Sequence, residues 1–257
     1  MNVGILVDDT NIDKWQANAI EYLLENSNAE ISLIIENNQG LNFDKYIHSM
    51  LDDGVWAFHE GIGLLKRKLG NYPSYREQVE LLDVVNSEPV VLQCEPIPTN
   101  KIGVRFPESA VNFVSCEADV LIRFGFGFIV GGILTAPEYG VLSYHHGNIR
   151  EFRGRPAGFW EFMSNQDSVG ITVQQLTEDL DAGAIAAEKE VDISKLNTWQ
   201  DIKHELFMQS YDLLLEAVRN TKSGDLQEVS ARGNIYTRPT FKQYVAYIWQ
   251  NYIHSQV

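Results

Sequence analysis

Residues 119–147, DVLIRFGFGFIVGGILTAPEYGVLSYHHG, contain two short apolar runs, one at each end of the stretch. The first, DVLIR, leads into the glycine-rich FGFG, and the second, GVLSYHHG, ends in two adjacent histidines. Short apolar runs bounded by turn residues are typical of buried strands in a parallel sheet. Because ligands bind at the carboxyl ends of such strands, we expect chemistry at the end of the second run.

The rest of the chain alternates predicted strands and helices. Apolar runs predict strands and helical spacing predicts helices, and the N-terminal part opens as strand, helix, strand. The predicted strands are residues 3–7, 30–37, 89–96, 170–176 and 184–193, and the predicted helices are residues 15–26, 54–70, 106–118 and 198–220. The last helix is predicted as one long amphipathic helix with an apolar stripe of Ile202, Leu206, Tyr211, Leu214 and Val218.

These elements predict a single α/β domain with a Rossmann-like, mostly parallel twisted sheet flanked by helices. We place this domain at residues 1–222 and a C-terminal extension packed on it at residues 223–257. Residues 233–252 predict a short strand followed by a helix. Two roles stay open for this aromatic tail, formation of a homodimer or a cap on the domain.

Composition narrows the class of partner. The formal charge of −15 argues against nucleic acid as the main ligand, because affinity for polyanions comes mostly from Lys and Arg. No window approaches the roughly 18 consecutive apolar residues of a membrane-spanning helix. The N-terminus, MNVGILVDD, lacks the basic region of a signal peptide, so a cytoplasmic protein is expected.

Three common site motifs do not fit the sequence. The nearest dinucleotide-binding match, at Gly125, Gly127 and Gly131, has the wrong spacing and does not follow the first strand. Adjacent strand residues such as His145 and His146 point to opposite faces, and no further ligand spacing supports a metal site. Ser143 lacks the Gly-x-Ser-x-Gly turn of a serine hydrolase.

Three motifs resemble those of the formyltransferase superfamily, which includes glycinamide ribonucleotide, methionyl-tRNA and sugar-nucleotide N-formyltransferases. SYHHGNIREFRGRP at residues 143–156 is similar to the family's Asn-x-His-Pro-Ser-Leu-Leu-Pro followed by Arg-Gly and Pro. VGIT at residues 169–172 and DAGAI at 181–185 resemble Thr-Gly-x-Thr and Asp-x-Gly-x-Ile. The resemblance extends over about residues 1–200 and implies the formyltransferase fold.

The resemblance implies an enzyme that transfers a formyl group from 10-formyltetrahydrofolate to a primary amine. The tetrahedral intermediate of that reaction carries an oxyanion, and the amine must lose a proton. His145 would be the oxyanion partner and proton carrier. Asp181 would set the tautomer and charge of His145 and help to remove the amine proton.

Ser143 stands where the family has Asn. A serine hydroxyl is shorter than an amide and can rotate, so three outcomes stay open. Ser143 substitutes for Asn directly or through water, Asn148 or His146 supplies the donor, or the protein has drifted from formyl transfer towards binding folate or a nucleotide sugar.

The resemblance also implies binding residues. The pterin pocket of the family maps onto the loop before the histidine and the backbone before the aspartate, namely Phe126, Phe128, Ile129, Leu134, Glu178, Asp179 and Leu180. The acceptor would meet the segment after the histidine, with Asn148, Arg150, Arg153 and Arg155 as candidate contacts, the arginines for phosphates.

An amino-sugar nucleotide is the favoured acceptor, and no metal is expected. Methionyl-tRNA is disfavoured as the acceptor because about 60 residues after the core leave little room for a tRNA-binding domain. A glycinamide ribonucleotide-type transferase is the other alternative. A deformylase is disfavoured because no regulatory domain precedes the first strand.

Overall fold

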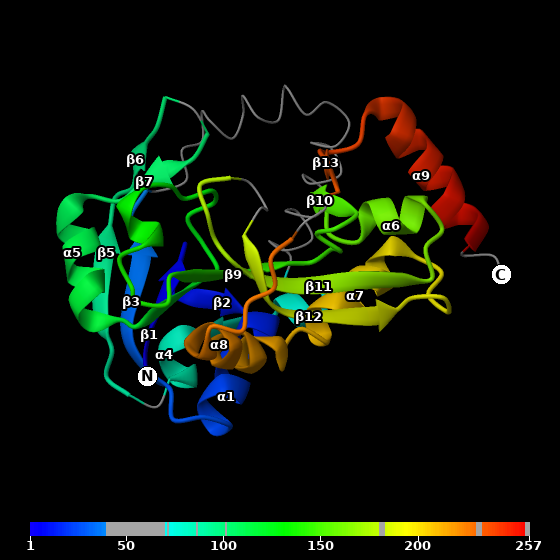
Figure 1. Ribbon diagram of the computed structural model, residues 1–257. Helices are drawn as coiled ribbons and strands as arrows, with labels where there is room; N and C mark the ends of the chain where they lie inside the picture. The colour runs from blue at the N-terminus through cyan, green and yellow to red at the C-terminus, as the bar shows by residue number, and fades with distance from the viewer. Residues whose placement is uncertain are drawn as a thin grey trace.

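A seven-stranded sheet forms the centre of the part of the protein that the computed structural model describes, which is residues 1–39, 70, 72–85, 87–100, 102–179, 183–229 and 233–254 (Figure 1). The strand order is β12-β11-β9-β8-β1-β3-β5. These strands are β1 (Asn2–Val7), β3 (Glu30–Asn37), β5 (Val90–Cys94), β8 (Val120–Arg123), β9 (Val141–His145), β11 (Ser168–Gln175) and β12 (Ala184–Asp192).

Five neighbouring strands of this sheet, from β9 to β5, are parallel. The strands β11 and β12 are antiparallel to their neighbours and form a long hairpin at the other edge. The predicted fold class, a mostly parallel sheet flanked by helices, is confirmed. The carboxyl ends of β1, β8 and β9 meet at one edge of the parallel part, which places the end of β9 where ligands bind in such sheets.

Each face of the sheet packs against its own hydrophobic core. Along β1, Val3, Ile5 and Val7 face the first core, which contains residues of α1 (Lys14–Glu25), α7 (Trp199–Met208) and α8 (Leu213–Ser223). Leu6 faces the second core, which contains residues of α5 (Glu108–Glu117) and the 3-10 helix η2 (Gly132–Leu134). This alternation follows from the two-residue period of a strand.

Smaller elements surround the sheet. The short strands pair as β2 (Asn11–Asp13) with β4 (Gln78–Glu80), β6 (Ile97–Pro98) with β7 (Val104–Arg105), and β10 (Phe152–Gly154) with β13 (Asn234–Tyr236). The remaining described helices are the 3-10 helix η1 (Ser74–Arg76), α4 (Leu81–Val84), α6 (Phe159–Met163) and α9 (Phe241–His254).

Most predicted elements occur in the structure within two residues of their expected bounds. Residues 54–69 of one predicted helix lie outside the described residues. The prediction of one long helix over residues 198–220 is wrong, because α7 ends at Met208 and α8 begins at Leu213. Tyr211 lies in the break and is 40% exposed, whereas the other four residues of the predicted stripe are buried.

The break between α7 and α8 is held by polar contacts with the sheet. The hydroxyl of the buried Ser210 donates to the carbonyl of Leu206 (2.6 Å) and lies 2.9 Å from His146 Nε2. Tyr144 Oη donates to the Ser210 carbonyl (2.9 Å). On the edge strand β12, Lys189 Nζ pairs with the Asp212 carboxylate (2.8 Å). These contacts satisfy backbone groups that a continuous helix would have paired internally.

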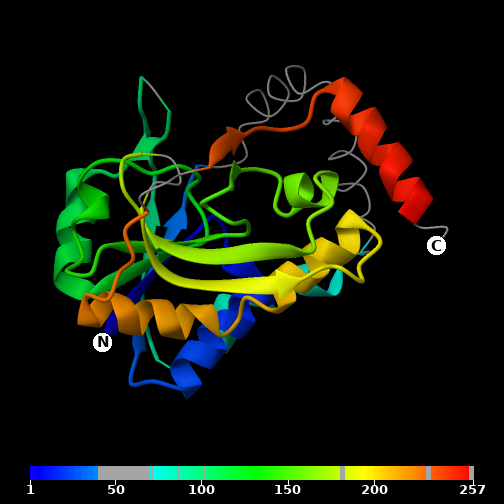
Figure 2. The same ribbon diagram turned by 45° about the vertical axis from the view of Figure 1, so that its right-hand side comes forward.

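The C-terminal helix α9 packs beside α6 and α7, at the opposite edge of the molecule from α5 (Figures 1 and 2). The buried Tyr247 contacts Phe159 and Trp199, with ring centroids 5.5 and 5.7 Å apart. Other aromatic residues of α9, including Trp249 and Tyr252, are exposed. The division at residue 222 and the dimer role of the tail stay predictions. None of the described helices is both long enough and apolar enough to cross a membrane.

Removing the Ser210 hydroxyl tests the role of the helix break. Because that hydroxyl donates to Leu206, its oxygen accepts from His146 Nε2–H, and Ser210→Ala leaves this buried N–H without an acceptor. We expect the free energy of unfolding to fall by about 1–3 kcal/mol in urea titrations. The exposed Ser223→Ala is the control and should change the free energy of unfolding by less than about 0.5 kcal/mol. Equal effects of the two variants would contradict this account.

Candidate active site

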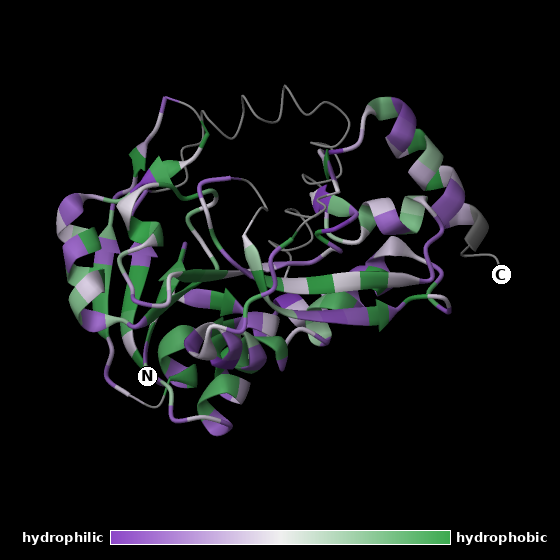
Figure 3. Ribbon diagram, viewed as in Figure 1, coloured by the Kyte–Doolittle hydropathy of each residue, from purple (hydrophilic) through white to green (hydrophobic). Residues whose placement is uncertain are grey.

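The candidate site is a row of polar side chains on the face of the sheet that also packs against α5. Strand register places Ser143 of β9 between Arg123 of β8 and Gln174 of β11. Two residues further along β9, His145 pairs with Thr172 of β11. Paired residues share a face, so these five side chains lie together. Along β11, polar or small residues alternate with buried apolar ones (Figure 3).

Ser143 is buried and is held by the guanidinium of Arg123. The Ser143 hydroxyl oxygen accepts from Arg123 Nη2 (2.7 Å) and Nε (3.1 Å). Arg123 Nη1 also donates to the carbonyl of Gly127, in the turn after β8. A positive charge therefore lies beside the residue that replaces the family's Asn. The sequence analysis missed Arg123. It could have been found, because a basic residue at the end of an apolar predicted strand lies at the edge of the sheet where ligands bind.

His145 has a defined tautomer. Its Nε2 lies 3.1 Å from the carbonyl oxygen of Phe152, and the ring is only 8% exposed. Because a carbonyl oxygen can only accept, this contact places the proton of the neutral ring on Nε2. The fold thus fixes which nitrogen of the ring donates to the backbone.

His146 points to the opposite face of β9. Its ring packs among the aromatic rings of Trp15, Tyr144 and Phe207, at centroid distances of 4.1 to 5.7 Å. Burial, assisted by the neighbouring His145, lowers the pKa of His146 to about 3, so the ring is neutral. The hypothesis that His146 supplies a donor to the oxyanion is wrong, because the residue belongs to the core.

Glu161 of α6 is a candidate site residue that sequence reasoning missed. It is 3% exposed, and its Oε1 has no hydrogen-bond partner among the described residues. Burial raises the pKa of its carboxyl to about 7, against smaller opposite effects of backbone amides, including that of Asn148. A buried oxygen without a partner costs about 1–3 kcal/mol. No sequence motif signals Glu161, because its burial results from the tertiary fold.

Gly147 brings His145 and Glu161 close together. A Cβ atom at Gly147 would lie 2.9 Å from His145 Nε2, 3.2 Å from the Phe152 carbonyl oxygen and 3.3 Å from Glu161 Oε1. The absence of a side chain at this position therefore allows three polar atoms to approach one point.

The residues predicted to bind the pterin fall into three groups. Phe126, Ile129 and Leu134 are buried in the second core, and Phe128 is half-buried. Glu178 and Asp179 are exposed. Leu180 and the candidate catalytic Asp181 lie outside the described residues.

The glycine-rich loop is fixed to the first strand. Asp8, at the end of β1, accepts from the Phe126 amide (2.7 Å), and a Cβ at Gly125 would lie 2.4 Å from the Asp8 amide nitrogen. The loop before the histidine strand is thus packed against the carboxyl end of β1.

The predicted acceptor residues follow β9 but make different contacts. Asn148 accepts from the Arg150 amide (3.0 Å), and the Arg150 side chain pairs with Glu188 of β12, with Nη2 3.1 Å from Oε1. Arg153 Nε donates to the carbonyl of Gly233 (2.8 Å). Arg155 is exposed. The three arginines therefore do not converge on one point through these contacts.

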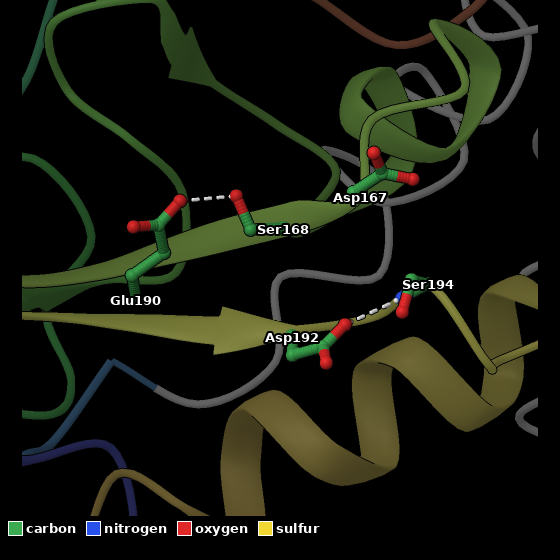
Figure 4. A pocket seen from close by; sticks show the side chains of 5 residues that line it. All are labelled: Asp167, Ser168, Glu190, Asp192 and Ser194. Carbon is green, nitrogen blue, oxygen red and sulfur yellow. Dashed lines mark hydrogen bonds between the residues drawn. The ribbon is translucent and has the colours of Figure 1, made fainter.

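A shallow acidic hollow lies where β11 begins and β12 ends, at the end of the hairpin away from the connection between the two strands (Figure 4). Asp167, Glu190 and Asp192 line it, together with Ser168 and Ser194. Ser168 donates to Glu190, and the Ser194 amide donates to Asp192 (2.9 Å). Within the described residues, no group of three or more His, Cys, Asp or Glu side chains is arranged to hold a metal ion.

The fold and the polar row define an α/β protein with a candidate catalytic histidine at the carboxyl end of a parallel strand. A family model described as formyl transferase matches residues 77–218, which is more than half of the chain. The chain therefore belongs to the formyl transferase family, and the resemblance inferred from its motifs is confirmed.

Individual relatives are distant. A methionyl-tRNA formyltransferase of Thermotoga neapolitana is 27% identical over 136 residues, which cover 52% of this chain and 42% of that protein. The chain thus spans about half the length of the curated relatives it matches. Glycinamide ribonucleotide transformylase 1 from Symbiobacterium toebii has a TM-score of 0.58 at 16% identity, covering 92% of this chain and 94% of that one. A sugar N-formyltransferase from a Shewanella species has a TM-score of 0.54 at 15% identity, covering 92% and 76%. These likenesses support the fold.

The raised pKa of Glu161 predicts a pH-dependent stability difference. The Glu161 carboxyl has a pKa of about 7 in the folded state and an ordinary value of 4.5. Between these two pH values the folded state therefore binds more protons than the unfolded state does. The stability contributed by that proton is present below pH 4.5 and is lost as pH rises through 7.

The non-titrating Glu161→Gln variant should therefore gain stability relative to the wild type as the pH rises. We expect a relative gain of about 1–3 kcal/mol between about pH 5 and pH 8, measured by urea unfolding. The opposite pH dependence of His146 is common to both proteins and cancels in this comparison. A stability difference that does not vary with pH would contradict the raised pKa.

Proposed function

We propose that the protein transfers a formyl group from 10-formyltetrahydrofolate to a primary amine of a small molecule, with an amino-sugar nucleotide as the favoured acceptor. The observation that carries this proposal is the part of the polar row formed by Arg123 at the end of β8 and by Ser143 and His145 at the end of β9, in a chain of the formyl transferase family. The row combines a cation, a hydroxyl and an imidazole of defined tautomer.

In the proposed mechanism, each end of this row has a separate task. The positive charge of Arg123 stabilises the negative charge that develops on the formyl oxygen, together with the Ser143 hydroxyl that Arg123 orients. His145 takes up the proton of the attacking amine at Nδ1, because Nε2 donates to the Phe152 carbonyl. The same proton would then pass to the donor nitrogen as the bond between that nitrogen and the formyl carbon breaks, which releases tetrahydrofolate and restores the neutral imidazole. Asp181, which follows β11, is proposed to orient and charge-balance His145.

We place the formyl donor against the loop before β9. When bound, 10-formyltetrahydrofolate supplies the formyl carbon. The loop lies against the polar row, because the Gly127 carbonyl accepts from Arg123. Phe128 is the one predicted pocket side chain of this loop that is only half-buried, so we propose that it packs against the pterin, whereas Phe126, Ile129 and Leu134 stabilise the loop from the core.

Charge favours a small acceptor over methionyl-tRNA. The net charge of −15 opposes binding of a polyanion, and Arg150 is paired with Glu188. The methionyl-tRNA alternative rests on the names of the curated relatives, such as that of Thermotoga neapolitana. A glycinamide ribonucleotide-type acceptor is a further alternative. Tight, salt-sensitive binding of initiator tRNA in a filter assay would reverse the ranking.

Replacing His145 tests the proton-transfer role. His145→Ala should lower kcat for formyl transfer by about 10²- to 10⁴-fold, because the amine proton loses its acceptor. The dissociation constant for 5-formyltetrahydrofolate should stay within about threefold, since the imidazole is not proposed to hold the pterin. Steady-state assays with amino-sugar nucleotides and fluorescence titrations measure the two quantities. A wild-type protein that neither binds a folate nor transfers formyl groups would overturn the proposal.

The Arg123–Ser143 pair has its own test. Arg123→Met should lower kcat by about 10²- to 10³-fold, as expected for the loss of an oxyanion-stabilising group. Ser143→Asn should also lower kcat, by about tenfold, because the larger amide displaces the guanidinium from its 2.7 Å contact. Arg219→Met, an exposed change on α8, is the control.

A large gain in formyl transfer by Ser143→Asn would contradict this account of the pair. Such a gain would favour the alternative that the natural serine belongs to a folate- or nucleotide-sugar-binding protein that has lost catalysis.

A further inference from the structure

A cavity next to His145 is not explained by the proposed mechanism. It has a volume of about 490 Å³, within the size range of small-molecule sites. Its walls come from the segment after β9, from α6 and from β11 and β12, including Asn148, Glu161, Gln166, Gly170 and Glu190. It lies on the same face of the sheet as the polar row, because Thr172, the partner of His145, also lines it.

The cavity has an excess of negative charge. Four carboxylates line it, those of Glu151, Glu161, Glu188 and Glu190. Among the described residues, Arg150 forms an ion pair with Glu188, and no cation pairs with the other three. A cavity with this charge favours a cationic ligand.

The second cation at the cavity, Lys189, does not offset this charge. Its ammonium group pairs with Asp212 and also donates to the Gln209 carbonyl (3.2 Å), both in the break between α7 and α8. Because strand residues alternate between faces, Lys189 points away from Glu188 and Glu190.

Glu161 supplies an independent sign of a missing ligand. Glu161 is only 3% exposed, and its Oε1 lacks a hydrogen-bond partner in the described part of the chain. Buried polar atoms are paired in the great majority of native proteins. A donor from a bound ligand would complete this pairing. Gly147 lies close to both Glu161 Oε1 and His145 Nε2, so a donor paired with Glu161 would lie near the ring of the candidate catalytic histidine, on its Nε2 side.

We propose that this cavity binds the amine end of the acceptor, with the Glu161 carboxylate paired to its primary ammonium group. The inference rests on the proposed function for the identity of the acceptor. A primary ammonium offers three donors to the carboxylates, and the hydroxyls of a sugar match the polar side chains of Asn148, Gln166 and Ser168. The cavity therefore selects hydroxylated primary amines over their neutral analogues.

A matched pair of probes tests this selectivity. Glucosamine and glucose differ by one ammonium in place of one hydroxyl, and NMR titration of the 15N-labelled full chain follows the amide signals of Gln166 and Gly170. We expect glucosamine to shift these signals and to bind at least about tenfold more tightly than glucose. Equal affinities, or shifts confined to residues outside the cavity, would overturn the proposal.

Variants identify the carboxylate that is responsible. Glu161→Gln keeps the shape of the side chain and should abolish the preference for glucosamine, with the affinity for 5-formyltetrahydrofolate unchanged. Glu25→Gln, an exposed change at the end of α1, should keep the preference. Glu190→Gln leaves the buried carboxyl intact and should weaken glucosamine binding by a smaller factor. A Glu161→Gln variant that still binds glucosamine more tightly than glucose would contradict the proposal.

These experiments distinguish failure of the cavity proposal from failure of the proposed function. Formyl transfer to an amine whose KM is the same in wild type and Glu161→Gln would leave the function standing and overturn this site. Selective glucosamine binding in the cavity, without formyl transfer to any amine, would overturn the function and leave the site standing.

Discussion

The two-residue period of β9 is the constraint on which the candidate site depends. Ser143 and His145 face the polar row only because Leu142 and Tyr144 face the first core. A register slip of one residue would exchange these faces and put His146 in place of His145. The register is fixed from the core side, where Tyr144 binds the Ser210 carbonyl and His146 its hydroxyl. The break between two helices thus holds a strand whose other face carries the chemistry.

Charge is unevenly distributed along that face. Arg123 lies at one end of the polar row, and the carboxylates of Glu161, Glu188 and Glu190 lie beyond the other end, with His145 between them. In the proposed reaction, negative charge develops on the formyl oxygen and positive charge arrives with the amine. Each end of the row is opposite in sign to the charge that it would stabilise. An imidazole between them can accept a proton without a large movement of either partner.

Much of the fold follows from local sequence. Alternation and short apolar runs predict β1, β3, β9 and the β11–β12 hairpin, because burial acts residue by residue along a strand. The single helix over residues 198–220 fails because helical periodicity continues through Ser210, whereas the tertiary contacts of Ser210 interrupt the backbone there.

The site was predictable only in part, for the same physical reason. His145 and Ser143 stand within a motif, so sequence reasoning finds them. Arg123 acts across strands, and Glu161 becomes notable only when α6 is folded against Gly147. Neither relation is local in sequence. The family motif also placed Phe126, Ile129 and Leu134 beside the pterin, and periodicity alone does not separate a pocket wall from a core residue.

The serine at position 143 is best understood together with the neighbouring strand. A half-buried guanidinium needs acceptors, and within the described residues the Gly127 carbonyl and the Ser143 oxygen are among those of Arg123. An asparagine at 143 would be bulkier and would displace the guanidinium, whereas the smaller serine accepts from Arg123 and leaves its positive charge beside the end of β9. The turn that exposes the Gly127 carbonyl depends in turn on the close approach of Gly125 to Asp8. FGFG after β8 and SYHH at the end of β9 are therefore coupled, because a change in either segment alters the position of the Arg123 guanidinium.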